Sequence, residues 1–145
     1  MNPSGLTMLA LVVISLAGCL PIPDHYQVTA DVSGVLMRDN VALAGVQICS
    51  KSKFLTTTSC STSDSHGHFR LAPVYNTTFP MSLYGDRLIS YELTATENAT
   101  SIAIWRAQGT GQATTYVRLS CALDKPIPGA SYGTSSNTFC AVERM

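Results

Sequence analysis

Four of the five cysteines could form either disulfide bonds or a metal site. Zinc sites built from cysteine commonly use a C-x-x-C pair with two histidines separated by about three to five residues, and neither pattern occurs here. In an oxidising compartment an even set of cysteines instead favours two disulfides, for which three pairings are open. The pairs Cys49–Cys60 and Cys121–Cys140 each close a short loop, so we expect these two bonds, each stabilising the fold by about 3 kcal/mol.

Ser131 lies in Gly129-Ala130-Ser131-Tyr132-Gly133, which matches the G-x-S-x-G pattern of hydrolase nucleophiles. That arrangement needs a strand before the serine and a helix after it, which expose the hydroxyl beside backbone donors. The flanking segments DKPIP and TSSN favour neither element, and no histidine follows Ser131. We therefore expect a loop here, and a serine-dependent hydrolase remains the alternative.

Asp64, His66 and His68 lie within five residues and could chelate zinc or copper if their side chains converge. A small metal-dependent hydrolase is the corresponding alternative function. The competing interpretation is an ordinary turn around Gly67, in which the two histidines are solvent-exposed. We favour the turn, and we expect no metal or other cofactor.

Charge and aromatic residues restrict the classes of ligand. Nine basic and nine acidic side chains are scattered singly after residue 19, without a basic stripe for phosphates, so nucleic acid is excluded as an expected partner. Tyr91, Trp105 and Tyr116 could form a binding face for carbohydrate or peptide. Packing in the core or across strands is the more common role of such strand aromatics, and we expect it here.

Residues 6–18 form an uncharged apolar stretch, LTMLALVVISLAG, that ends at Cys19. A membrane-spanning helix needs about 20 apolar residues, so this stretch has the length of a signal-peptide core instead. Its end, Leu16-Ala17-Gly18-Cys19, resembles the lipobox of bacterial lipoproteins. The resemblance implies that residues 1–18 are a signal peptide, that Cys19 is lipidated and that acyl chains such as palmitate anchor the protein stably. Leu20, in place of an aspartate after the cysteine, favours the outer membrane.

The remainder of the chain is predicted to be all-β. Residues 19–24 resemble a short proline-stiffened tether, and apolar residues then alternate in strands at 27–36, 41–50, 54–62, 68–74, 81–84, 88–96, 101–106 and 114–122. Turn residues separate these strands at Asp39-Asn40, Ser65-His66-Gly67, Asn76, Gly85-Asp86, Glu97-Asn98 and a hairpin turn at Gly109-Thr110-Gly111. Seven or eight short strands at this spacing indicate a sandwich or barrel over residues 25–123, followed by an irregular tail over 124–145 held by Cys121–Cys140.

Residues 32–71 carry a recognisable pattern. Gly34-Val35, then Ala44-Gly45-Val46, then Thr62, Asp64, Gly67, Phe69 and Leu71 are similar to the carboxypeptidase-regulatory-like, or transthyretin-like (prealbumin-like), repeat. Ala42-Leu43 departs from the usual Pro-Val of that family, and Ser63 is inserted. The resemblance implies a seven-stranded Greek-key β-sandwich in which Asp64 bonds the turn backbone, Gly67 takes a positive φ and Phe69 fills the core.

These observations predict a noncatalytic lipoprotein of the cell envelope, facing the periplasm from the outer membrane. Its domain is expected to bind or brace another periplasmic or outer-membrane component, and exposed strand edges offer one route for pairing with a partner. A lipoprotein of a secretion apparatus and a lysozyme-inhibitor-like lipoprotein are sharper alternatives within this class. Members of the transthyretin-like family generally serve as accessory or binding modules, which agrees with a role outside catalysis.

Overall fold

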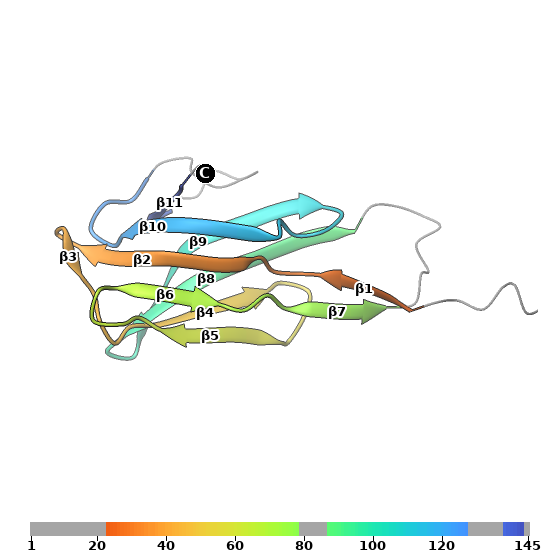
Figure 1. Cartoon of the computed structure of the whole chain (residues 1–145), viewed down its shortest axis with the longest axis horizontal. Helices are drawn as coiled ribbons and strands as arrows, with labels where there is room; N and C mark the ends of the chain where they lie inside the picture. The colour runs from red at the N-terminus through yellow and green to blue at the C-terminus, as the bar shows by residue number, and fades with distance from the viewer. Residues whose placement is uncertain (1–22, 79–86, 128–137, 144–145) are drawn as a thin grey trace, which may run out of the picture.

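The computed structural model describes residues 23–78, 87–127 and 138–143, and within them the protein is all-β. Figure 1 shows the strands running along the long axis of the molecule. In chain order they are β1 (Asp24–Gln27), β2 (Asp31–Arg38), β3 (Val41–Ala42), β4 (Gln47–Ser52), β5 (Thr58–Thr62), β6 (His68–Leu71), β7 (Tyr75–Thr78), β8 (Leu88–Glu97), β9 (Thr100–Thr110), β10 (Tyr116–Ala122) and β11 (Cys140–Val142).

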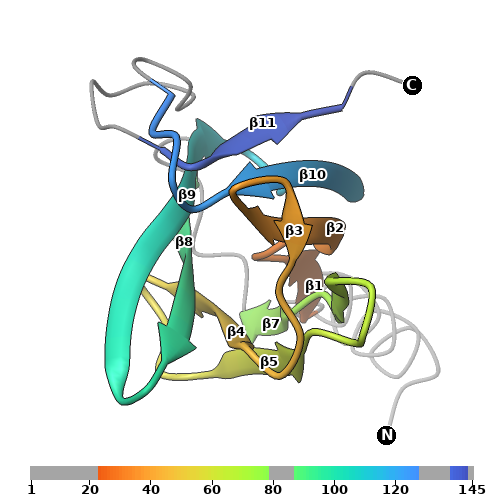
Figure 2. The same cartoon turned by 90° about the vertical axis from the view of Figure 1, so that its left-hand side faces the viewer.

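The strands form two large sheets and a small ribbon. One sheet has the order β11-β10-β2-β3, with β6 also paired to β2, and the other has the order β5-β4-β8-β9. Strands β1 and β7 make the ribbon. Viewed end-on in Figure 2, the four-stranded sheet curves around one side of β2 and β10. The all-β prediction is confirmed, and the two large sheets enclose a common core.

The core is made by the alternation of the strands. Residues that were predicted to share one face of a strand are buried together. These are Val46, just before β4, with Ile48 in β4, and Phe69 with Leu71 in β6. They join the apolar face of β8 and the inward residues of β2 and β10 in one cluster. Burial of each large aliphatic side chain stabilises the fold by roughly 1.5–3 kcal/mol. The cluster thereby fixes which side chains of each strand point inward, and the alternate side chains point to the outer faces.

The chain passes repeatedly between the two large sheets. Strands β2 and β10 are adjacent and parallel, with Val32 opposite Val117, although most of the domain separates them in sequence. Strand β9 ends at Thr110 in the other sheet. The connection through Gly111, which has φ 90°, therefore crosses between sheets, and the predicted hairpin turn at Gly109-Thr110-Gly111 was wrong.

The predicted strand over residues 27–36 is interrupted. Val28 and Thr29 both donate their backbone N–H groups to the carbonyl of Val74, at 2.8 and 3.4 Å, and this bend separates β1 from β2. Strand β1 begins at Asp24, so the ordered ribbon starts inside the segment assigned to the tether. Its partner β7 includes Asn76, which was expected in a turn and instead lies opposite Tyr26.

The C-terminal segment is not wholly irregular. Strand β11 pairs antiparallel with β10, and Cys140 lies directly opposite Cys121. Upstream, Ile127 and Thr138 form an isolated bridge. Strand β11 was not predicted because residues 124–145 are rich in proline and serine. The strand depends on its pairing with β10, which the local sequence does not indicate. The predicted strand at residues 81–84 lies outside the described residues.

Candidate functional site

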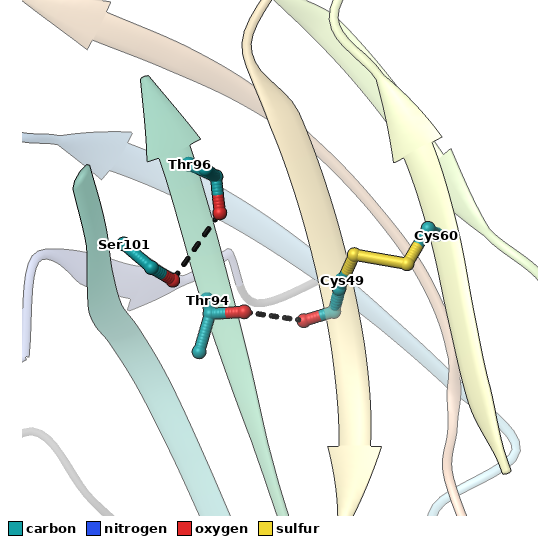
Figure 3. Close-up of a disulfide and its surroundings, with 5 residues drawn as sticks. All are labelled: Cys49, Cys60, Thr94, Thr96 and Ser101. Carbon is teal, nitrogen blue, oxygen red and sulfur yellow. Dashed lines mark hydrogen bonds between the residues drawn. A yellow bond between two sulfur atoms is a disulfide. The ribbon is translucent and has the colours of Figure 1, made fainter. Parts of the chain in front are cut away.

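The structure joins Cys49 to Cys60 and Cys121 to Cys140, the two pairs that the short loops predict. Cys121 and Cys140 are fully buried and tie β11 to the core. Cys49 and Cys60 instead face outward from β4 and β5. Figure 3 shows this disulfide beside Thr94, whose hydroxyl donates to the Cys49 carbonyl at 3.5 Å, and near the hydroxyl pair of Thr96 and Ser101. The outer face of this sheet is thus polar and rich in hydroxyl groups.

Asp64, His66 and His68 form a turn of the predicted kind. Asp64 Oδ1 accepts the backbone N–H groups of His66 and His68, each at 2.8 Å, and these bonds lower the pKa of the Asp64 carboxyl. Gly67 has φ 76°. The two imidazole rings are 6.4 Å apart. In the part of the chain that the structure describes, no group of three or more His, Cys, Asp or Glu side chains could hold a metal ion.

Two other predicted sites fall outside the described residues. Cys19, with residues 1–18 before it, is one, and Ser131 with its surrounding G-x-S-x-G segment is the other. Among the described residues no helix is long and apolar enough to span a bilayer.

The three aromatic residues do not share a face. Tyr91 and Trp105 are buried in the core, where their rings meet edge-on with centroids 5.8 Å apart. Burial raises the pKa of Tyr91 to about 12. Tyr116 lies on β10 in the other sheet and bonds Ser33. Core packing was the expected role of Tyr91 and Trp105, and it is confirmed.

The main concavity among the described residues lies at one end of the four-stranded sheet, on its outer face. Its volume is about 760 Å³, within the range of pockets that hold small ligands. The floor is a row across three strands, in which Lys51 lies opposite Glu92 and Glu92 lies opposite Arg106. These three side chains point outward because their neighbours along each strand, such as Ser52, face the core.

One wall of this concavity is the connection between β4 and β5, residues 53–57, which was expected to be part of a strand over 54–62. The Lys53 backbone N–H donates to the Ser90 carbonyl at 2.9 Å, and the Phe54 N–H donates to the Ser52 hydroxyl at 3.2 Å. Both bonds hold the start of the connection against β8 and β4. Phe54 itself is 56 % exposed.

The concavity is cationic, and we call it the cationic groove, defined by Lys51, Lys53, Phe54, Glu92, Arg106 and Gln108. The Arg106 guanidinium bonds Glu92 at 3.0 Å, so the carboxylate is already compensated. Neither lysine forms an ion pair among the described residues. The other described basic side chains each have an acidic partner within 4.0 Å: Arg38, Arg70, Arg87, Arg106, Arg118 and Lys125.

The groove presents groups that can bind an anion. Two ammonium groups, an amide and hydroxyls surround the floor beside an exposed aromatic ring. Ammonium groups donate hydrogen bonds and attract anions. These two interactions do not by themselves break a bond in a ligand, which also requires a positioned base and a nucleophile. The sequence pattern Lys51-Ser52-Lys53-Phe54 contained the signal for this site. It was missed because Phe54 was predicted to begin a strand over 54–62, whereas the structure places it in the connection between β4 and β5.

Comparison of the chain with protein-family models, with curated proteins and with solved structures gives no match.

Proposed function

We propose that this protein is a noncatalytic lipoprotein of the cell envelope and that its domain binds another component of the periplasm or outer membrane through the cationic groove. The observation that carries the binding role is the pair Lys51 and Lys53. They are the two lysine or arginine residues of the described chain without an acidic partner, and both line the same concavity. Unpaired cations gathered in a groove are available to a ligand.

The lipid anchor is supported by the sequence Leu16-Ala17-Gly18-Cys19, which resembles a lipobox. The first described strand begins only five residues after Cys19, at Asp24, so the connecting chain can span at most about 18 Å. The domain would therefore be held close to the membrane surface. Leu20 after the cysteine supports the outer membrane, with the domain facing the periplasm.

A transthyretin-like Greek-key sandwich is part of the same proposal. It is supported by the sheet orders β11-β10-β2-β6 and β5-β4-β8-β9, between which the chain passes repeatedly. The positions that carry the resemblance also have the expected local structure. Asp64 accepts two backbone N–H groups of the turn, Gly67 has a φ of 76°, and Phe69 lies in the core. In that family such a domain is generally an accessory or binding module.

The anchor is tested by labelling with radioactive palmitate in a bacterium with two membranes. We expect label on the wild-type protein in the outer-membrane fraction, and none on Cys19→Ser. Unlabelled wild-type protein in a soluble fraction would contradict the proposed lipid anchor and outer-membrane location.

The binding role is tested with a photoreactive residue at position 54, which lies on the groove, and with the same residue at Tyr75, which is 61 % exposed on the ribbon. Cross-links to envelope material from position 54 alone are expected. Equal cross-linking from both positions, or none from position 54, would argue against the groove as the binding site.

A further inference from the structure

The cationic groove has the chemistry of a site for a negatively charged saccharide. We propose that it binds a sugar that bears a carboxylate or phosphate group, with the anionic group between Lys51 and Lys53 and a sugar ring against Phe54. This inference rests on the proposed binding role and narrows it to one class of ligand.

The charges on the groove indicate that the ligand carries an anionic group. Lys51, Lys53 and Arg106 contribute three positive charges, and Glu92 contributes the one negative charge. Because Glu92 is engaged by Arg106 at 3.0 Å, the uncompensated charge lies at the two lysines. Lysine is a compact point charge that suits a carboxylate or a phosphate equally, so the lysines do not distinguish these two groups.

The saccharide follows from the remaining surface. Phe54 leaves more than half of its side chain exposed, on a connection fixed by bonds to Ser52 and Ser90. An aromatic face beside hydroxyl and amide groups fits a sugar ring, which has apolar C–H faces and a polar rim. Gln108 and Ser90, opposite each other on β9 and β8, supply such polar groups on the floor.

A peptide ligand is less well matched. Peptide-binding grooves recognise several apolar anchors or add a strand to a free sheet edge. The floor of the groove is the outer face of β4, β8 and β9, where the described lining is mainly polar, and Phe54 is its one strongly exposed apolar residue. The outer face continues into the hydroxyl-rich region around Cys49 and Cys60 (Figure 3), which could accept further sugar units.

The test uses the full chain, purified in a nonionic detergent, and titration by calorimetry or by amide NMR shifts. The probes are trigalacturonic acid, its methyl ester as the uncharged control, galactose 6-phosphate as the phosphate-bearing sugar, and triglutamate blocked by N-acetylation and C-terminal amidation as the peptide with the same number of carboxylates. We expect at least one charged sugar to bind tenfold or more tightly than the methyl ester, and binding to weaken in high salt because the contacts are exposed. Preference for trigalacturonic acid or for the phosphate sugar identifies the anionic group.

Three variants make the test specific. Lys51→Gln/Lys53→Gln is expected to weaken binding of the charged sugar at least tenfold. The matched control Arg118→Gln/Lys125→Gln also removes two positive charges, but from residues that do not line the groove, and is expected to leave binding within about twofold. Phe54→Ala is expected to weaken sugar binding severalfold without changing triglutamate binding, and near-UV circular dichroism checks that each variant is folded.

The proposal is overturned if neither charged sugar binds more tightly than the methyl ester, if the control variant loses as much affinity as the lysine variant, or if triglutamate binds as tightly as the sugars regardless of Phe54. These outcomes are separable from the proposed function. Palmitate labelling and cross-linking from position 54 would persist if only the ligand class is wrong. Absence of palmitate labelling would overturn the proposed lipid anchor and location, and it would leave the sugar titrations unaffected.

Discussion

Cys49 and Cys60 lie directly opposite each other on β4 and β5, and their disulfide closes the hairpin whose connection forms one wall of the cationic groove. The cross-link therefore joins two strands that already pair. Ser50 pairs with Ser59, and Lys51 with Thr58, between this bond and the connection that carries Lys53 and Phe54.

Removing this cross-link should destabilise the domain. The double variant Cys49→Ala/Cys60→Ala is expected to lower the free energy of unfolding by about 3 kcal/mol, because the unfolded chain regains the freedom of the closed loop. Urea unfolding of the full chain measures the change. Cys121→Ala/Cys140→Ala should cost more, since these side chains are fully buried and their removal also leaves a cavity in the core. An equal or smaller loss from the second pair would contradict this ranking.

Gly67 and Gly45 should respond differently to alanine, although both have a left-handed backbone. A Cβ at Gly67 would collide with the carbonyl oxygen of Leu36, whereas a Cβ at Gly45 would meet no atom within 4 Å. Gly45→Ala is expected to cost about 1 kcal/mol from the backbone alone, and Gly67→Ala clearly more. Thermal or urea unfolding of the two variants side by side tests this, and similar losses would show that contact with Leu36 is relieved at little cost.

The Asp64 turn should contribute to acid sensitivity. Backbone N–H groups of His68 and His66 lower the pKa of Asp64, so the unfolded chain takes up a proton at a higher pH than the folded chain does. The contribution of Asp64 is present above the unfolded pKa, near 3.8, and is lost as the pH falls through the lower folded value. Asp64→Asn is expected to flatten the fall in the urea midpoint between pH 5.5 and 3. A profile parallel to that of the wild type would exclude Asp64 as a source of this dependence.

Ionisation of Tyr91 should contribute to the loss of stability at alkaline pH. Burial raises its pKa from 10.0 to about 12, and a backbone hydrogen bond with Ala30 opposes that shift only partly. Stability from this group is complete below pH 10 and is lost between pH 10 and 12, because the unfolded chain ionises first. Tyr91→Phe is expected to reduce the alkaline fall in stability, whereas Tyr75→Phe, at an exposed position, should not. Equal effects of the two substitutions would argue against burial as the cause.

Local patterns predicted much of this fold. The turn around Gly67 was predictable because Asp64, Gly67 and Phe69 each satisfy a local requirement of backbone or core. The two disulfides were predictable because each closes a short loop. Strand β11 and the bend at Val28 were not, since their hydrogen bonds go to β10 and to Val74, which are distant in sequence.

The groove was the least predictable feature. It depends on which lysines lack an acidic partner, and ion pairs such as Arg70 with Asp31 join residues far apart in the chain. Lys51 falls between the strands predicted over 41–50 and 54–62, and no local pattern shows that Glu92 forms an ion pair with Arg106.

The parallel pairing of β2 with β10 has a consequence for how the protein matures. Strand β2 occupies the middle of its sheet and stays without this neighbour until Tyr116–Ala122 is available, because β10 follows β3 to β9 in the chain. Contacts of such long sequence separation are slow to form. We therefore expect the two large sheets to close late in folding and, under the proposed export, after release from the translocation machinery, which would leave the chain dependent on protection from proteases during that interval.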